Sequence, residues 1–269
     1  MTDDLAFAVS LATGAGEILM DRYERLERID YKSARDVVTE ADHQSEALIL
    51  DSIRARFPTD AIVAEETGEH TADAGEAPRS GHGRVWIADP LDGTINYANG
   101  IPFFCVSIGL AVDGRPAVGV IHDPARSETF AATADGPALL YPSGGGPPIE
   151  IRASPKEKVT DFVISMGLNG RAAADRSRRA RRAVRQVRNM GSAALALAYV
   201  ANGRFDAMVQ QGGLSSWDIA GAGLIAERAG ARVTAFDGGP WFDLAHQATS
   251  IGIVAAPGAH HEAILRLVR

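Results

Sequence analysis

Two aspartates separated by two residues lie in the middle of the chain and are the first candidates for chemistry. Asp89 and Asp92 directly follow the apolar run 85–88, whose composition predicts a buried strand. Pro90 stiffens the turn between them, and Gly93 allows a backbone angle that other residues rarely adopt. Carboxylates held together in this way suit a hard divalent cation, which prefers oxygen ligands. A turn whose aspartates bond only their own backbone is the alternative, and the complete pattern favours the metal.

Further carboxylates stand at the ends of other predicted elements. Glu65 and Glu66 follow the short apolar strand 61–64, Asp218 opens a helix, and Asp42 lies near the start of another helix. Sites in α/β proteins gather at such ends, and buried carboxylates must be paired or must bind a metal. None of these segments contains an obvious cationic partner, so the set as a whole indicates a metal site.

The elements that must position these residues alternate between helices and strands. Apolar periodicity predicts helices over 4–29, 39–57, 171–188, 191–201, 219–229 and the last ten residues. It predicts strands over 61–64, 85–88, 103–112, 117–121, 128–132, 159–166, 205–209 and 251–255, with a hairpin turn at Asp113-Gly114. Segments 67–83 and 135–155 are predicted to be loops. This alternation predicts a layered α/β fold.

Composition limits the classes of partner. Apolar residues make up 46% and charged residues 23% of the 269 residues, as in an ordinary globular protein. The net charge of −7 argues against nucleic acid as a partner, and an anionic substrate would need a cation in the site. Cys105 is the only cysteine, so no internal disulfide can form. With no signal-peptide pattern and no apolar run long enough to span a membrane, we expect a cytoplasmic protein without membrane contact.

Four segments, in order and with similar spacing, resemble the inositol monophosphatase family, which belongs to the magnesium-dependent, lithium-sensitive sugar phosphatases. They are Lys32-Ser33 with Asp36 through Asp42, residues 64–67, Trp86 through Tyr97, and residues 217–222. The resemblance covers nearly the full chain and implies an α-β-α-β-α sandwich and a homodimer. We expect one subdomain over 1–145 with most metal ligands, and a second over 146–269 with Asp218 and the substrate contacts.

The resemblance also implies roles for the matching residues. Two magnesium ions would be held by Glu65, Asp89, the backbone carbonyl of Leu91, Asp92 and Asp218. Thr94 and Asp42 would orient and deprotonate a metal-activated water, and Glu66 would support that water or a third, weaker magnesium ion. The substrate would contact Asp92, Gly93, Thr94, Gly191, Ser192, Ala193, Gln211 and Asp218. The implied reaction is hydrolysis of a phosphate monoester without a covalent phosphoenzyme.

The sequence leaves the identity of the substrate open. Gln211 lies seven residues before Asp218, where inositol-specific members of the family carry a glutamate that accepts hydrogen bonds from the inositol ring. A glutamine still accepts through its carbonyl oxygen but has lost the charge. Inositol monophosphate, fructose 1,6-bisphosphate, histidinol phosphate and other sugar or polyol phosphates are all candidates.

Two other classes of protein are possible. Haloacid-dehalogenase-type phosphatases use two aspartates with one residue between them. Asp89 and Asp92 have two residues between them and do not match this motif. A non-catalytic, metal-binding regulatory protein is suggested by the eight arginines within 171–188. That segment has no interleaved aromatic residues for stacking on bases, so a solvated helix face or a subunit interface explains it better.

Overall fold

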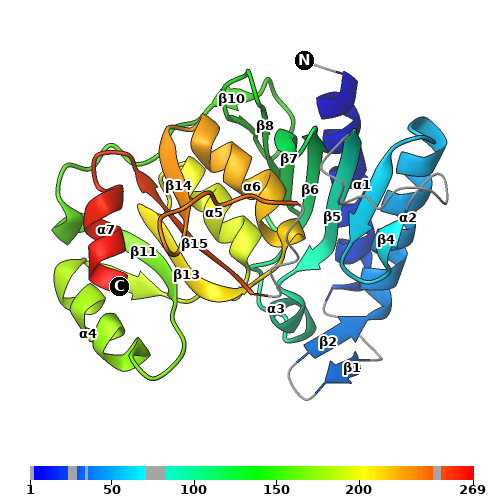
Figure 1. Cartoon of the computed structure of the whole chain (residues 1–269). Coiled ribbons are helices and arrows are strands. Elements are labelled where there is room, and N and C mark those ends of the chain that lie inside the picture. Colours follow the sequence, from blue (N-terminus) through cyan, green and yellow to red (C-terminus); the bar gives the residue numbers. More distant parts are fainter. Residues whose placement is uncertain (1–2, 24–28, 34–35, 71–82, 245–249) are drawn as a thin grey trace.

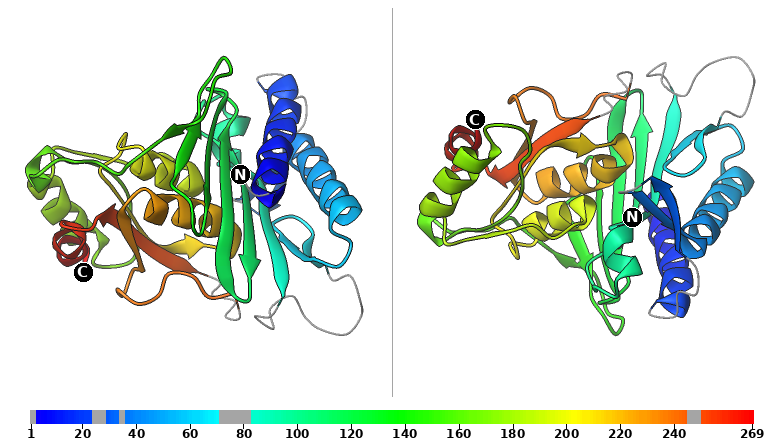
Figure 2. Two further views of the ribbon diagram at one scale, coloured as in Figure 1. Left: turned by 90° about the horizontal axis from the view of Figure 1, so that it is seen from above. Right: turned by 90° about the horizontal axis from the view of Figure 1, so that it is seen from below.

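Helices and two large β-sheets alternate in five layers in the part of the chain that the computed structural model describes (Figure 1). α1 (Asp3–Arg22) and α2 (Glu40–Arg56) cover the outer face of the first sheet. α5 (Ala193–Ala201) and α6 (Ser216–Arg228) lie between the two sheets, and α4 (Ala173–Ala183) and α7 (His261–Val268) cover the second sheet from outside. Figure 2 shows the same succession of layers from above and below. The predicted α-β-α-β-α sandwich is confirmed.

The structure describes residues 3–23, 29–33, 36–70, 83–244 and 250–269, and for residues 29–33 and 36–39 it describes the backbone alone. The predicted helical residues 24–28, the predicted loop residues 71–82 and the side chains of Lys32, Ser33 and Asp36 therefore lie outside the description. No helix within the described ranges is long and apolar enough to cross a membrane.

The first sheet has the strand order β10-β9-β8-β7-β6-β5-β3-β4, and of its neighbouring strands only β3 and β5 run parallel. Its strands are β3 (Ala61–Ala64), β4 (Gly68–His70), β5 (Arg84–Asp92), β6 (Cys105–Val112), β7 (Arg115–Asp123), β8 (Glu128–Thr133), β9 (Leu139–Tyr141) and β10 (Ile149–Glu150). The short helix α3 (Thr94–Ala98) follows β5 directly. Asp113 and Gly114, at the predicted β6–β7 turn, both have positive φ angles of 47° and 74°, as a tight hairpin requires.

The second sheet has the strand order β12-β11-β13-β15-β14. Its strands are β11 (Val163–Gly167), β12 (Gln186–Arg188), β13 (Ala207–Leu214), β14 (Ala231–Ala235) and β15 (Ile251–Pro257). A separate hairpin consists of β1 (Ile29–Ser33) and β2 (Asp36–Thr39), and a short 3₁₀ helix, Val159–Asp161, precedes β11. The division into subdomains 1–145 and 146–269 stays a prediction; the first sheet extends to Glu150 in β10.

Several predicted boundaries are wrong. The helix predicted over 171–188 ends at Ala183, because Val184 and Val187 are buried in the core under the second sheet and β12 pairs with β11. The predicted loops 67–83 and 135–155 contain the short strands β4, β9 and β10, and β14 was not predicted. The strand predicted from residue 159 begins with the 3₁₀ helix. These short elements are stabilised by neighbouring strands rather than by their own sequence pattern.

Glycines bring α6 against the first sheet. A Cβ atom built on Gly119 of β7 would lie 2.3 Å from the carbonyl oxygen of Gly221 in α6, so only glycine fits there. A Cβ atom on Gly109 of β6 would likewise lie 3.0 Å from the Cβ of Ala220. This backbone-to-backbone contact places the first turn of α6, which carries Asp218, beside the end of β5.

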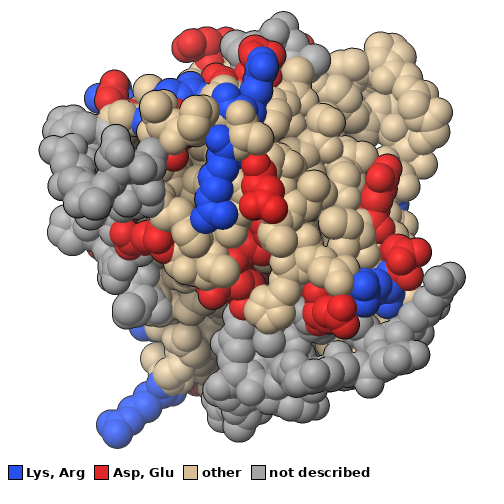
Figure 3. Space-filling model, turned by 90° about the vertical axis from the view of Figure 1, so that its right-hand side faces the viewer, with Lys and Arg blue, Asp and Glu red and all other residues tan. Residues whose placement is uncertain are grey.

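The side of the molecule covered by α1 and α2 carries acidic and basic side chains close to one another (Figure 3). Arg84 of β5 forms an ion pair with Asp4 of α1 at 2.9 Å and with Asp60 at 2.8 Å, and Arg56 of α2 pairs with Asp3. The Arg84–Asp4 pair links α1 to the sheet, and the exposed Arg56–Asp3 pair links the two helices to each other. Exposed pairs of this kind each contribute little on their own.

Replacing His122 is expected to reduce the sensitivity of the fold to acid. Burial lowers the pKa of His122 to about 4, and its Nδ1 lies 2.8 Å from Thr129 Oγ1. Because the ordinary pKa is higher, the unfolded chain binds a proton first, and stability is lost as the pH falls from about 6.5 towards 4. Urea unfolding at pH 7 and pH 4.5 should show that His122→Asn loses about 2 kcal/mol less stability than wild type over this interval. Equal losses in both proteins would contradict the assignment.

Candidate active site

A bulge at the end of β5 brings its two aspartates to the same side of the sheet. Asp89 pairs with Ser107 and Asp92 with Cys105, so three steps along β5 oppose two along β6. Side chains on a regular strand alternate, and residues three apart would face opposite sides without this extra residue. Pro90, which has no backbone N–H to donate, lies within the bulge, where a proline is tolerated.

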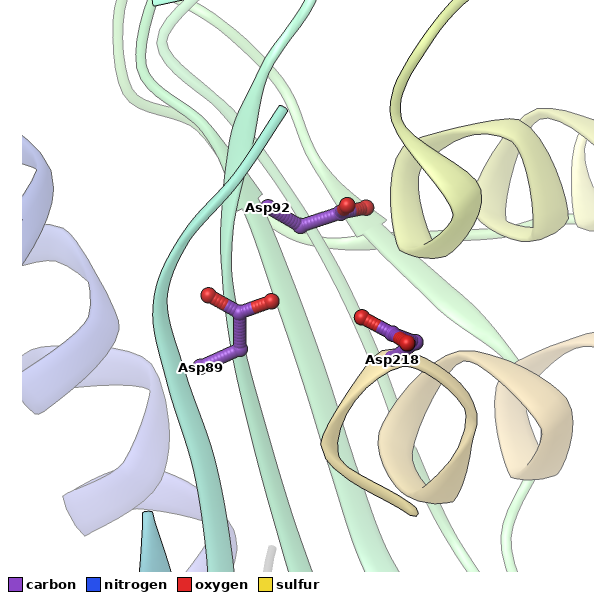
Figure 4. Close-up of side chains that lie close together, drawn as sticks. All are labelled: Asp89, Asp92 and Asp218. Atoms are coloured by element: carbon purple, nitrogen blue, oxygen red, sulfur yellow. The ribbon is translucent and has the colours of Figure 1, made fainter. Parts of the chain in front are cut away.

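Asp218 joins them from the other side, from the first turn of α6. One carboxylate oxygen each of Asp89, Asp92 and Asp218 lies within 4.8 Å of the other two (Figure 4). Figure 4 shows the three side chains gathered between the end of β5 and the start of α6, with Asp92 nearest to α5. The structure thus brings together residues that are up to 129 positions apart in the sequence.

Backbone and hydroxyl donors fix the orientation of each carboxylate. Asp89 Oδ1 accepts from the N–H of Leu91 at 2.8 Å, and Asp218 Oδ2 accepts from the N–H of Ser215 at 2.6 Å. Asp92 Oδ2 accepts at 2.6 Å from both the hydroxyl of Ser192 and the N–H of Ala194, at the start of α5. The positive ends of α5 and α6 therefore support two of the three carboxylates.

The electrostatics of this cluster call for a cation. Burial raises the pKa of Asp89 well above its usual range, and repulsion from Glu65, Asp92 and Asp218 raises it further. Burial and the charge of Asp92 do the same to the pKa of Asp218. The pKa of Asp92 is raised by burial, although the hydrogen bond from Ser192 opposes the shift. An all-oxygen donor set whose negative charges repel one another fits magnesium.

A polar pocket of about 260 Å³ lies beside the cluster. Its described lining has hydroxyl, amide, carboxylate and apolar groups but no Lys, Arg or His; it consists of Asp92, Ser165, Asn189, Gly191, Ser192, Ala193, Met208, Gln210, Gly213, Leu214 and Asp218. The predicted substrate contacts Asp92, Gly191, Ser192, Ala193 and Asp218 all line it.

Gln210, which the sequence analysis missed, lines this pocket, whereas the predicted Gln211 does not. Gln211 lines a neighbouring cavity of about 370 Å³, and its side-chain oxygen accepts from the N–H of Asn169 at 3.3 Å. The register of β13 against β15 shifts between Gln210 and Leu214, so counting back from Asp218 crosses an irregular segment and reaches the neighbour of the residue that lines this pocket. Gly167 makes room for Gln210, because a Cβ there would lie 2.0 Å from the Gln210 side-chain oxygen.

The remaining predicted residues surround the end of β5. Glu65 follows β3, its N–H donates to the Ala88 carbonyl at 3.2 Å, and its charge raises the pKa of Asp89. The hydroxyl of Thr94 donates to the Leu91 carbonyl at 3.0 Å. Asp42 is buried on α2.

Gly93 and Glu66 also occupy defined positions. Gly93 has a φ of 97°, and a Cβ there would lie 3.1 Å from the Phe103 carbonyl oxygen, so glycine is required. The N–H of Glu66 donates to Glu46 Oε2 at 2.9 Å. The pairing of Asp42 with Thr94 and the supporting role of Glu66 stay predictions.

This chain is similar to known proteins in sequence. The model of the inositol monophosphatase family matches residues 1–269. A fructose-1,6-bisphosphatase/inositol-1-monophosphatase of Thermotoga maritima is 32% identical over 271 residues, covering 99% of this chain and 96% of the relative. Inositol monophosphatase 3 of Solanum lycopersicum is 35% identical, with 95% and 92% covered. Nus factor SuhB of Salmonella typhimurium is 34% identical, with 87% and 86% covered.

Solved structures agree with the sequence comparison. The inositol monophosphatase of Thermotoga maritima superimposes with a TM-score of 0.83 at 32% identity, covering 99% of this chain and 97% of that one. The extragenic suppressor protein suhB of Bartonella henselae gives a TM-score of 0.87 at 29% identity, with 100% and 99% covered. The family is magnesium-dependent, and the acidic cluster of this chain could hold such an ion. From the matched sequence, the shared fold and the acidic cluster at the end of β5, we conclude that this chain belongs to the inositol monophosphatase family.

Proposed function

We propose that this protein is a magnesium-dependent phosphate monoester hydrolase that acts on inositol monophosphate or a related polyol phosphate. The convergence of Asp89, Asp92 and Asp218 beside a polar pocket is the observation that supports this proposal most directly. A phosphate monoester carries about two negative charges at neutral pH. Such a substrate needs a cation beside these carboxylates.

Different residues of the chain would hold the magnesium ions and bind the phosphate. Glu65, Asp89, the Leu91 carbonyl, Asp92 and Asp218 would hold the magnesium ions. When bound, magnesium neutralises the phosphate, activates water and stabilises the leaving alkoxide. The N–H groups of Gly93 and Thr94 bind phosphate oxygens.

Proton transfer falls to Thr94 and Asp42 in this proposal. Thr94 orients a water for attack on phosphorus, and Glu66 supports that water. A proton of the attacking water passes to the Thr94–Asp42 pair. The P–O bond to the alcohol breaks as the new P–O bond forms, and the products are the polyol and inorganic phosphate. Because water attacks directly, no covalent phosphoenzyme forms.

The pocket favours a neutral alcohol with several hydroxyls. Ser165, Asn189 and Gln210 offer neutral hydrogen-bonding groups, and the described lining lacks a basic side chain for a second phosphate. We therefore expect inositol 1-phosphate and glycerol 2-phosphate to be hydrolysed faster than fructose 1,6-bisphosphate or histidinol phosphate. Phosphate release from this panel in magnesium tests the proposal. Turnover of none of the esters would instead favour a non-catalytic regulatory protein.

Gln210→Glu is expected to shift the preference towards inositol. A carboxylate accepts hydrogen bonds from hydroxyls about twice as strongly as an amide, so the ratio of kcat/KM for inositol 1-phosphate to that for glycerol 2-phosphate should rise about fivefold. Gln211→Glu is the matched control, because Gln211 lines the other cavity, and it should leave this ratio unchanged. If this ratio rises for Gln211→Glu and not for Gln210→Glu, Gln211 contacts the polyol, as predicted from the sequence.

The assembly and location of the protein remain part of the proposal. We infer a cytoplasmic homodimer that acts on a small phosphate ester and needs no nucleic acid for that reaction. Sedimentation of the purified chain tests the dimer, and a monomer at micromolar concentration would contradict it.

A further inference from the structure

We propose that Glu46 is a positioning residue that fixes the turn carrying Glu65 and Glu66 and thereby sets the affinity of the site for magnesium. This inference rests on the proposed metal site, to which Glu46 itself contributes no ligand. It follows from the buried polar face of α2, from two hydrogen bonds that this face makes, and from one carboxylate oxygen that has no partner.

The face of α2 that packs on the first sheet is polar in its first half. Asp42, Ser45 and Glu46 expose 1%, 0% and 1% of their surface, whereas Ile49 and Ile53 continue the same face with apolar side chains. Charged residues are rarely buried to this extent unless they have a specific partner. The polar half lies over the ends of β3 and β5, where the proposed metal ligands are.

This polar face holds both loops that carry metal ligands. Glu46 Oε2 accepts from the N–H of Glu66 at 2.9 Å, and the hydroxyl of Ser45 donates to the carbonyl of Pro90 at 3.2 Å. Glu65 is therefore fixed on both sides, because its own N–H donates to Ala88 on β5 and the next N–H donates to Glu46. These two backbone hydrogen bonds fix the direction in which the Glu65 side chain leaves the main chain.

The second oxygen of Glu46 has no such partner. Glu46 Oε1 is buried and has no hydrogen-bond partner among the described residues. Leaving a buried acceptor unsatisfied is costly, so packing alone would favour an apolar side chain at this position. An acceptor oxygen here is thus explained by the bond to Glu66 and by its place beside the site rather than by packing.

Two substitutions separate the bond from the charge. Glu46→Gln keeps a side-chain oxygen that can accept from Glu66, and Glu46→Ala removes it. Ile53→Ala is the matched control, because it loosens the same face of α2 two turns further on, away from both loops. Each EDTA-treated protein is titrated with MgCl₂ in a calorimeter, and its rate of phosphate release is measured against magnesium concentration.

We expect Glu46→Ala to weaken magnesium binding about tenfold in both measurements, because the loss of a residue that supports a metal ligand commonly has an effect of this size. The kcat at saturating magnesium should stay within about threefold of wild type. Glu46→Gln should stay within about threefold of wild type in magnesium affinity. Ile53→Ala should lower the melting temperature without changing that affinity.

Three outcomes would overturn the inference while leaving the proposed function intact. Magnesium affinity could be unchanged in Glu46→Ala, it could fall equally in Ile53→Ala, or Glu46→Gln could lose as much affinity as Glu46→Ala, which would assign the effect to charge. A wild-type protein that binds no magnesium would instead overturn the proposed function and this inference together.

Discussion

Asp92→Asn is expected to lower kcat by at least about a hundredfold at saturating magnesium, because the substitution removes a charge that holds the cation. Asp92 Oδ2 also accepts from Ser192 and Ala194, so an amide there disturbs the contact between β5 and the start of α5. Steady-state phosphate release as a function of MgCl₂ measures the effect.

Asp123→Asn provides the control for this substitution. Asp123 is fully buried, whereas Asp92 is partly exposed; Asp123 accepts from Tyr199 and Arg126 and is not among the residues of the acidic cluster. We expect its replacement to lower stability while kcat stays within about threefold of wild type. An Asp92→Asn protein that retains more than a tenth of wild-type kcat would contradict a ligand role for Asp92.

Thr94→Ala and Asp42→Asn are each expected to lower kcat by about a hundredfold or more, the usual contribution of acid–base groups. If the two residues act as one unit on the water, the double variant should be little slower than the slower single variant. The structure places the Thr94 hydroxyl 3.0 Å from the Leu91 carbonyl and buries Asp42 on α2, so each has a fixed position. Single-turnover rates for the four proteins complete the cycle.

Losses that multiply in the double variant would show that Thr94 and Asp42 serve different steps. Thr94→Ser is the control, because it keeps the hydroxyl and should recover most of the rate lost in Thr94→Ala. A Thr94→Ser protein as slow as Thr94→Ala would assign the effect to packing rather than to the hydroxyl.

The acidic cluster could be predicted because its local signals are strong. Asp89 and Asp92 follow an apolar strand and surround a proline that favours a bulge, and Asp218 lies in the first turn of a clear helix. Strand and helix ends meet at the same edge of a layered α/β fold, so the sequence was enough to predict their convergence.

Gln210 and Glu46 could not be found in this way. Which glutamine faces the pocket depends on the register irregularity between Gln210 and Leu214, and the sequence gives no sign of where β13 departs from regular pairing. Glu46 resembles any exposed helical glutamate until α2 is placed on the ends of β3 and β5. Similarly, β12 forms because β11 offers a free edge to residues that have a helical pattern in isolation.

Phosphate release from inositol 1-phosphate by EDTA-treated protein, before and after addition of excess MgCl₂, tests the central claim most directly. The acidic cluster needs a cation for substrate to bind and react, so activity should fall to background in EDTA and return with magnesium. Full activity in excess EDTA would contradict the assignment of Asp89, Asp92 and Asp218 as magnesium ligands.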